Sequence, residues 1–484
     1  MIAYRLFVVL NILLLCCCQN AREKNALSTF QMKRLQVSAN GRFLRQENGQ
    51  PFFWLGDTAW QLAQELNRDE VRIYFHDRRD KGFSVIQMVL IHELPEKNDY
   101  GDSPFIDADP AKPDTTPGND PNDPLAYDYW DHVDYIADEA AAAGIYLGMV
   151  VAWGSVVKKE FLTVANAETF TTWLTERYKD RPNIIWITGG DIRGDDHPQV
   201  WRIIGTTLKK KDPTHLITFH PFGRTQSSTW FHREAWLDFN MFQSGHRRYD
   251  QMRPSDDPAT WKGEDNWKYV REDYALLPVK PTLDGEPSYE NIPQGLHDPS
   301  EPYWTDADAR RYAWWSVFAG ACGHTYGDNA VIQMHKPGAG VGDYGVRNFW
   351  YEAIHDPGAG QMHYLKSLML SRPYFERRPD QSLVAGENGQ KYDYVIATRG
   401  NSYAFFYTYT GREFDVAMGK ISGGRTRAWW YDPRSGDSRV IGIFENRGVR
   451  HFDPPGEQQP GNDWVLVLDD AEQDYGAPGE SGGG

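Results

Sequence analysis

Eight short apolar runs recur between Phe52 and Asp328, and this repetition limits the folds open to the chain more than any other feature. Alternation of such runs with helical patterns is typical of repeated β-α units around a parallel sheet. Eight units close into a (β/α)8 TIM barrel, whose chemistry lies at the carboxyl ends of the strands. The runs are FFWLGD, SVIQMVL, IYLGMVVAW, IIWITGGD, LITFHP, FNMFQSGH, PTLDGE and GHTYGD, and the helical patterns include residues 67–81, 127–143, 168–178 and 306–319.

A doubly wound open sheet is the competing fold. It usually carries a glycine-rich phosphate loop after its first strand, and residues 55–60, LGDTAW, contain no G-x-G-x-x-G motif. Two polar loops, 95–124 and 251–267, follow the second and sixth runs, on the face that a barrel would use for a site. The sequence therefore predicts a barrel over residues 30–370.

The pattern changes after residue 370. Short alternating or apolar runs, separated by Asn, Gly, Asp and Pro, continue without any helical pattern between them. They predict an antiparallel β-sandwich over residues 371–468 that packs on the barrel. In one run, adjacent Trp429 and Trp430 would place one ring on each face of the sheet. Residues 469–484 carry few apolar side chains, and we expect them to be disordered.

The N-terminus has the pattern of an export signal. Arg5 precedes an apolar run at 6–15, which is short for a membrane-spanning helix. Three cysteines at 16–18 end the run and resemble a bacterial lipobox, with Cys18 as the expected site of lipidation. We predict a signal peptide at 1–18 and a lipid-anchored protein of the bacterial periplasm or outer membrane; the alternative is a cleaved signal and secretion.

The composition excludes some classes of protein. A formal net charge of −16 argues against a nucleic-acid partner, because phosphate binding needs a concentrated basic surface. The chain has no H-E-x-x-H or C-x-x-C motif, and no G-x-S-x-G elbow follows any of the apolar runs, since the one match to that pattern, at 479–483, lies in the polar tail; a metal hydrolase or serine hydrolase therefore has no support, and no cofactor or metal is expected. Cys322 is the only cysteine outside the signal, so the mature domains can form no internal disulfide. The 18 Trp and 26 Tyr could stack on sugars or simply fill core volume.

Polar and aromatic side chains gather at the predicted strand ends. Each has an ordinary structural explanation, as a helix cap or a buried histidine, but a barrel would bring them all to one face. We predict that together they bind a substrate. The predicted substrate-binding residues are Asp57, Trp60, His92, Trp153, His220, Gln243, His246, Tyr326 and Asp328.

Two acids stand out among these strand ends. Asp191 ends the fourth run after two glycines, and Glu286 ends the seventh within PTLDGEPSYE. Acids on the fourth and seventh strands of a barrel form an arrangement used in glycoside hydrolysis, where one protonates the leaving oxygen and the other stabilises or attacks the anomeric carbon. Asp195 and Asp196 are rival acids near the first of these positions, and Asp284 and Glu290 are rivals near the second.

Three motifs carry a family resemblance: VSANGRFLRQENGQPFFWLGDTAW at 37–60, ITGGDIRGD at 187–195 and LDGEPSYE at 283–290. With the aromatic, β-rich C-terminal part, they resemble the apiosidase-like family of glycoside hydrolases. The resemblance implies a (β/α)8 barrel, a C-terminal domain labelled as collagen-binding, and a catalytic pair at Asp191 and Glu286. The best-known activity of the family removes apiose from branched pectin.

The sequence thus predicts an exo-acting glycoside hydrolase that cleaves a terminal sugar, such as apiose or another pectic side-chain sugar, from an oligo- or polysaccharide. Asp191 is the expected general acid and Glu286 the nucleophile or base, with retention of configuration favoured. Arg247 and Arg248, after the sixth run, could pair with a uronate or be solvated. The alternative is a non-catalytic surface protein that binds glycan or collagen.

Overall fold

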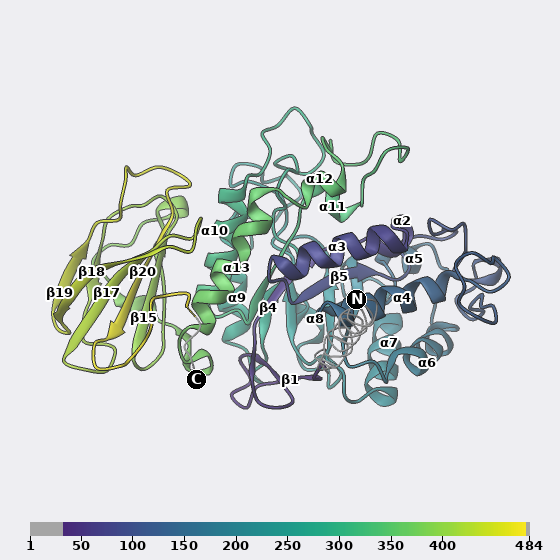
Figure 1. The fold of residues 1–484 in the computed structure, drawn as a ribbon, viewed down its shortest axis with the longest axis horizontal. Helices are drawn as coiled ribbons and strands as arrows, with labels where there is room; N and C mark the ends of the chain where they lie inside the picture. The colour runs from purple at the N-terminus through teal and green to yellow at the C-terminus, as the bar shows by residue number, and fades with distance from the viewer. Residues whose placement is uncertain (1–31, 481–484) are drawn as a thin grey trace, which may run out of the picture.

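A computed structural model describes residues 32–480, so the predicted signal peptide and Cys18 lie outside the described residues. The structure has a helix-covered barrel and, beside it, a smaller domain of β-strands (Figure 1). Within residues 32–480, no helix is long and apolar enough to cross a membrane.

The central sheet of the barrel has eight parallel strands, which confirms the predicted fold class. The strands follow the order β8-β7-β6-β5-β4-β11-β10-β9, so the seam lies between β8 and β9. The amide of Asp238 donates to the carbonyl of Ile217 at 2.9 Å across that seam, and Thr218 donates to the carbonyl of Phe239 at 2.7 Å. The strands are β4 (Trp54–Thr58), β5 (Val85–Val89), β6 (Tyr146–Val150), β7 (Ile184–Ile192), β8 (Ile217–Pro221), β9 (Asn240–Phe242), β10 (Thr282–Asp284) and β11 (Gly323–Tyr326), preceded by an antiparallel sheet of β1 (Leu35–Val37), β2 (Leu44–Gln46) and β3 (Pro51–Phe52).

Helices cover the outside of the barrel, and local sequence signals define where several of them begin. Asn67 caps the N-terminus of α3 and forms a capping box with Glu70, as the acidic start of this segment indicates. Asp128 caps α4 in the same way. The helices are α2 (Leu62–Glu65), α3 (Arg68–Asp80), α4 (Tyr129–Ala142), α5 (Gly154–Lys158), α6 (Ala167–Tyr178), α7 (Pro198–Lys211), α8 (Ser228–Phe231), α9 (Trp267–Tyr274), α10 (Asp306–Phe318), α11 (Asn329–Ile332), α12 (Trp350–Ala353) and α13 (Pro357–Leu370), with a 3-10 turn at Ile106–Ala108 in the long loop after β5.

The C-terminal domain is the expected antiparallel sandwich. A six-stranded sheet in the order β12-β14-β15-β20-β17-β18 faces a three-stranded sheet, β13-β16-β19. Trp430 is buried between the two sheets, and Trp429, on the other face of β17, packs against the core shared with the barrel. The strands are β12 (Arg378–Pro379), β13 (Val384–Ala385), β14 (Ile396–Arg399), β15 (Tyr403–Thr408), β16 (Phe414–Ala417), β17 (Arg425–Tyr431), β18 (Ser438–Glu445), β19 (Val449–Phe452) and β20 (Trp464–Asp470), with 3-10 turns at Tyr374–Glu376, Gln381–Leu383 and Lys391–Asp393.

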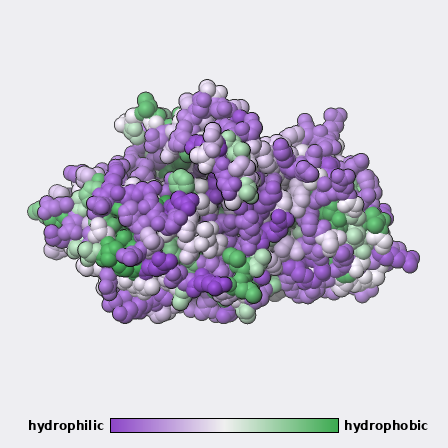
Figure 2. Space-filling view, turned by 180° about the vertical axis from the view of Figure 1, so that it is seen from behind, coloured by the Kyte–Doolittle hydropathy of each residue, from purple (hydrophilic) through white to green (hydrophobic). Residues whose placement is uncertain are grey.

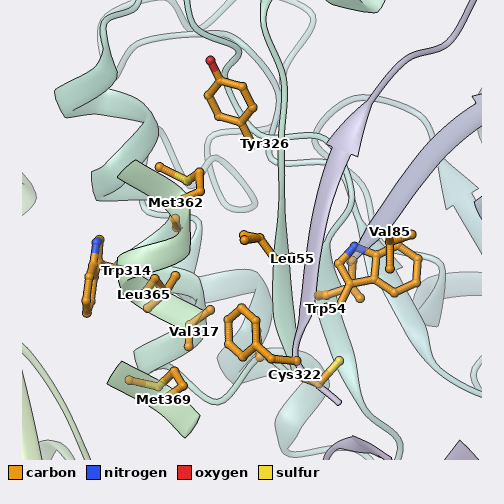
Figure 3. Packing of buried hydrophobic residues seen from close by; sticks show 14 of the residues in the cluster. Trp54, Leu55, Val85, Trp314, Val317, Cys322, Tyr326, Met362, Leu365 and Met369 are labelled. Atoms are coloured by element: carbon orange, nitrogen blue, oxygen red, sulfur yellow. The ribbon is translucent and has the colours of Figure 1, made fainter. Parts of the chain in front are cut away.

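The two domains share one hydrophobic core. Figure 3 shows Val317 of α10 and Leu365 of α13 beside Leu55 of β4, with Trp314 on the other side of the helices. There Trp314 stacks on Tyr407 of β15, with ring centroids 5.7 Å apart and 8° between the planes. The domains are therefore packed as one body at this junction.

Buried ion pairs join the domains at the edge of that core. Arg310 of α10 makes two contacts of 2.9 Å with Asp463, and Arg372 makes two of 2.8 Å with Asp469. All four side chains are almost fully buried. Removing one partner of such a pair would leave an uncompensated buried charge, which is strongly destabilising.

We expected residues 469–484 to be disordered, but the structure gives the chain from Asp469 to residue 480 defined contacts. Strand β20 continues to Asp470, Tyr475 exchanges a 2.6 Å hydrogen bond with Ser402, and the carbonyl of Gly476 accepts from Arg372 at 3.1 Å. Polar groups of the domain thus hold a segment too poor in apolar residues to order itself; residues 481–484 lie outside the described part of the chain.

The outer surface is mostly hydrophilic. From behind, apolar side chains gather in small patches, including one over the C-terminal domain at the right (Figure 2). Among the exposed apolar residues of the C-terminal domain are Val440 and Ile443 of β18, the free edge of the six-stranded sheet, and Val449 of β19.

Candidate active site

The carboxyl ends of the barrel strands surround a pocket of about 300 Å³. Both predicted catalytic acids line it, as a barrel with its site at this face requires. Of the predicted substrate-binding residues, five line the pocket: Trp60, His92, Trp153, Gln243 and His246.

Asp191 is held by an unusual backbone at the end of β7. Its φ is +47°, and Gly189 and Gly190 before it have φ of +87° and +106°. A side chain at Gly189 would place its Cβ 2.4 Å from the carbonyl oxygen of His220, and one at Gly190 would lie 2.6 Å from the ring of Trp153. The two glycines therefore allow the strand to turn closely past its neighbours and direct Asp191 into the pocket.

Glu286 follows β10 and is 7% exposed. Gly285 before it leaves no room for a side chain, since a Cβ there would lie 2.5 Å from the sulfur of Met241. Oε1 of Glu286 lies 3.0 Å from Nε2 of His246, and Oε2 lies 3.3 Å from Nε2 of His220. The first contact is a hydrogen bond; the second is close in distance but lacks the alignment of one.

His220 lies beneath the pocket and connects the two acids. It is fully buried, and its Nδ1 accepts from the backbone N–H of Asp191 at 3.4 Å. A neutral imidazole that accepts at Nδ1 carries its proton on Nε2, which is the atom that faces Glu286. His220 was predicted to contact substrate, but it touches the carboxylate and does not line the pocket.

The surroundings of the two acids move their pKa values in opposite directions. Burial alone would raise the pKa of Glu286, but His220 and His246 outweigh it and lower that pKa to about 2. Burial first, and then the negative charge of Glu286, raise the pKa of Asp191 above its usual value. Glu286 is thus a carboxylate near neutral pH, while Asp191 holds its proton to higher pH than an ordinary Asp.

Aromatic rings form one wall of the pocket. Trp60 and Trp153 lie 5.1 Å apart between ring centroids, and His92 lies 5.7 Å from Trp153. Trp60 and Trp153 also contact the ring of His220, at 5.1 and 5.9 Å. Such rings can pack on the apolar face of a sugar while the acids act on its anomeric carbon.

The prediction that Asp57 lines the pocket is wrong. Asp57 is fully buried between β4 and α3, where it accepts from Arg78 Nε at 2.5 Å and from Tyr74 OH at 2.6 Å. Side chains alternate across a strand, and the register of β4 turns Asp57 and Leu55 towards the helices. Asp57 therefore neutralises a buried arginine and has no access to substrate.

Tyr326 and Asp328 also lie outside the pocket. Tyr326 donates to Glu290 Oε2 at 2.5 Å, and the amide of Gly358, at the start of α13, donates to the same oxygen at 3.0 Å. Asp328 caps α11 and accepts from the amide of Ala330 at 2.8 Å. Both predictions are corrected for the same reason: these side chains face the helical layer.

The rival acids are held by other groups. Asp284 is fully buried, accepts from Ser244 and Asn266, and burial raises its pKa to about 6. Burial likewise raises the pKa of Glu290 to about 7 beside Tyr326. Asp195 pairs with Arg193, and Asp196 contacts His197 at 2.7 Å. None of the four lines the pocket.

Sequence reasoning missed several residues of the pocket. Tyr289 lies three positions after Glu286 in the quoted motif; its ring is 4.8 Å from His246, and its hydroxyl has no partner within residues 32–480. Tyr344 comes from the long segment between α11 and α12, where nothing in the sequence marks it. Burial and the nearby acids raise its pKa to about 12.

Arginines also line the pocket. Arg224 and Arg247 both reach it, and Arg247 also pairs with Asp256 at 2.6 Å. Arg248, by contrast, pairs with Glu301 at 2.7 Å and does not line the pocket. Across residues 32–480, no group of three or more His, Cys, Asp or Glu side chains is placed to hold a metal ion.

A barrel whose strand-end pocket holds two carboxyl groups on the fourth and seventh strands, with pKa values shifted in opposite directions, beside an aromatic wall has the arrangement of a glycoside hydrolase. Family models agree with this class. Residues 38–376 match the model "Apiosidase-like, catalytic domain", and residues 378–469 match "Putative collagen-binding domain of a collagenase". The chain belongs to the apiosidase-like family.

Solved structures support the assignment. A protein titled "Glycoside hydrolase" is 49% identical, with a TM-score of 0.87, over 92% of this chain and 98% of its own. A glycoside hydrolase family 5 protein from Bacteroides vulgatus is 47% identical, with a TM-score of 0.85, over 92% and 95%. A third protein, from the same organism, shares the fold at 12% identity and a TM-score of 0.61, over 92% of this chain and 83% of its own. No curated protein matches the chain.

Proposed function

We propose that this protein is an exo-acting glycosidase that removes a terminal sugar, such as apiose or another pectic side-chain sugar, with Asp191 as general acid and Glu286 as nucleophile. The observation that carries the proposal is that the pKa values of the two carboxyl groups are shifted in opposite directions. Histidines lower the pKa of Glu286 to about 2, whereas burial and the charge of Glu286 raise the pKa of Asp191. Pairs of acids with pKa values pushed apart in this way divide the acid and base roles between them.

In the first step, Asp191 donates its proton to the glycosidic oxygen as the bond to the anomeric carbon breaks. The Glu286 carboxylate stabilises the positive charge that develops on the sugar and forms a glycosyl ester. Asp191, now a carboxylate, takes a proton from water, and the hydroxide portion attacks the anomeric carbon and releases Glu286. Two displacements leave the sugar with its original configuration, so we expect retention.

A small pocket at one end of the barrel suits the end of a glycan chain better than its middle. The pocket is walled by Trp60 and Trp153 on one side and by residues of the loops after β9 and β11 elsewhere. A volume of about 300 Å³ is at the small end for ligand sites and suits one or two sugar rings. We therefore expect monosaccharide as the released product.

The direct experiment is a screen of the purified protein on aryl glycosides, including an apioside, and on pectic oligosaccharides. Released monosaccharide is measured by chromatography, and the anomer formed first is identified by proton NMR. Release of one sugar by the parent protein, with loss of release in Glu286→Gln, is the expected result. If no substrate in the panel is cleaved, and oligosaccharides bind without turnover, a non-catalytic glycan-binding protein replaces the proposal.

We also propose that the protein is exported and lipid-anchored through Cys18, on the strength of the signal pattern alone. Expression in a bacterium with labelled palmitate tests it. Label in the membrane fraction that disappears in Cys18→Ala, but persists in Cys16→Ala, is expected. Equal labelling of the Cys18→Ala protein would move the anchor to another cysteine, and unlabelled soluble protein would favour secretion.

A further inference from the structure

A second cleft lies where the two domains meet. Its volume is about 410 Å³, and the barrel lines it with the loop after β9 and the start of α9. The C-terminal domain completes it with residues 389–391 and Tyr394. We call it the junction cleft and define it by Tyr249, Trp261, Lys262, Trp267, Lys268 and Lys391.

The junction cleft adjoins the catalytic pocket through Trp261. The ring of Trp261 lies 3.8 Å from the guanidinium of Arg224 and 4.8 Å from that of Arg247. Both arginines line the catalytic pocket, whereas Trp261 lines the junction cleft. Trp261, Arg224 and Arg247 therefore form the wall between the catalytic pocket and the junction cleft. A glycan of a few sugars is long enough to reach from one to the other.

The lining of the cleft has the chemistry of a carbohydrate site. Trp267 stacks on Tyr394 of the C-terminal domain, with centroids 4.4 Å apart and 8° between the planes. Trp267 is 8% exposed, and its indole N–H has no acceptor within residues 32–480. A buried, unsatisfied donor beside partly exposed aromatic rings suits a ligand with many hydroxyl or carboxylate oxygens.

Positive charge gathers in this cleft although the whole chain carries a net charge of −16. Lys262 pairs with Glu272 at 3.0 Å, and Lys268 pairs with Asp265 at 2.8 Å. Lys391 lies over the ring of Tyr249 at 5.1 Å, and no carboxylate within residues 32–480 comes within 4.0 Å of its amine. Three lysines and one carboxylate, Asp265, line the cleft, and Lys391 is the lining lysine outside these two ion pairs; Asp265 also accepts from Tyr249 at 2.6 Å.

From this arrangement we propose that the junction cleft binds an acidic sugar, a uronate, in the same glycan whose terminal sugar enters the catalytic pocket. The inference rests on the proposed function, because it takes the end of the glycan that is cleaved to lie in the catalytic pocket. It assigns the C-terminal domain a share in substrate binding through Lys391 and Tyr394 and requires no collagen ligand.

The interface between the two domains also fixes the loop between β9 and α9, which carries Trp261. Tyr392 of the C-terminal domain donates to Glu264 at 2.9 Å, and buried Arg311 of α10 donates to Glu264 at 2.7 Å. Glu264 in turn accepts from the amide of Tyr249 at 3.2 Å. The loop between β9 and α9 is thereby fixed by both domains, so the cleft is formed before any ligand binds.

The test measures binding without turnover, in the full chain carrying Glu286→Gln. The probe is trigalacturonate, and the comparison ligand is its uncharged methyl ester, both titrated by calorimetry. We expect the ester to bind at least about tenfold more weakly and Lys391→Gln to weaken trigalacturonate binding by roughly threefold to tenfold. The loss should shrink between about 20 and 200 mM salt, since exposed charges are screened.

Lys420→Gln is the matched control, because it makes the same change of net charge in the same domain. Lys420 donates to Ser382 and does not line the cleft, so this variant should bind as the parent does. The proposal is overturned if the two lysine variants bind equally, if the methyl ester binds as tightly as the acid, or if trigalacturonate does not bind at millimolar concentration. The hydrolysis screen fails or succeeds independently of these titrations.

Discussion

Replacing Glu286 with Gln tests the proposed role of Glu286 as the catalytic nucleophile. Two histidines bring the pKa of Glu286 from its usual 4.5 to about 2, which corresponds to about 3 kcal/mol in favour of the carboxylate. At pH 7 the anion therefore exceeds the acid by about 10⁵ to one. Glutamine keeps the volume and can still accept the 3.0 Å hydrogen bond from His246, but it carries no charge and cannot form a glycosyl ester.

The loss should accordingly fall on turnover and leave the fold intact. We expect kcat to fall by at least about 10⁴, equivalent to more than 5 kcal/mol of transition-state stabilisation, with Tm within a few degrees of the parent. Initial rates on the best aryl glycoside give kcat and KM. Azide added to Glu286→Ala should restore release and yield a glycosyl azide, because a small anion can enter the space left by the side chain.

Glu93→Gln is the control for this experiment. Glu93 is an exposed glutamate that pairs with Lys159 and does not line the pocket, so its replacement should leave the rate unchanged. If Glu286→Gln retained more than about a tenth of the parent kcat on a natural glycan, Glu286 would not be the nucleophile. The proposed mechanism would then be wrong.

Asp191→Asn should lower kcat/KM for glycosides with poor leaving groups by at least about 10²-fold but spare activated aryl glycosides, whose leaving groups need little protonation. Equal losses of kcat/KM on both kinds of substrate would show that Asp191 is not the general acid. Because Glu286 stays ionised to about pH 2, the parent should lose kcat/KM mainly on the alkaline side, as Asp191 deprotonates. Glu286→Gln should move that alkaline limb of the residual activity to lower pH, because it removes the charge that raises the pKa of Asp191. An unshifted limb would show that the two acids are not coupled. Trp314→Ala should lower the free energy of unfolding by about 3–5 kcal/mol, since it empties the contact with Tyr407, and denaturant titration would contradict this with a change below about 1 kcal/mol. The isolated residues 378–469 should not bind collagen tightly, and a submicromolar Kd by surface plasmon resonance would oppose the role argued for the junction cleft.

Most of the barrel could be predicted because its strands are short apolar runs with parallel neighbours, and a barrel brings their carboxyl ends to one face. That argument placed Trp60, His92, Trp153 and Gln243 in the pocket with the acids. It could not decide which of two consecutive side chains faces inwards.

The direction of a strand-end side chain depends on register. Asp57 and Tyr326 face the helices because β4 and β11 present that parity to α3 and α13. A one-residue shift would reverse the outcome, and periodicity within a short buried run does not fix it, since both faces of such a strand are apolar.

Other parts of the site depend on contacts between distant segments. Tyr344 lies in an irregular segment, and Trp261 and Lys391 meet only because the C-terminal domain packs beside the loop after β9. The tail after Asp469 was expected to lack order because its own composition is polar; contacts made by Arg372 and Ser402 supply what the segment lacks. Such partners cannot be read from local composition.

The place of β20 has a consequence for how this chain is made. It is the last strand within residues 32–480 but lies inside its sheet, between β15 and β17. It carries Asp469, the partner of Arg372, and the residue just before it, Asp463, pairs with Arg310. During synthesis the barrel emerges first, so Arg310 and Arg372 remain without their carboxylates until residues 463–469 have left the ribosome. The six-stranded sheet, and with it the contact of Tyr392 with the loop after β9, is completed only after β20 is inserted. A message truncated even shortly before residue 463 would therefore yield a chain that retains both catalytic acids and lacks the means to complete the domain beside them.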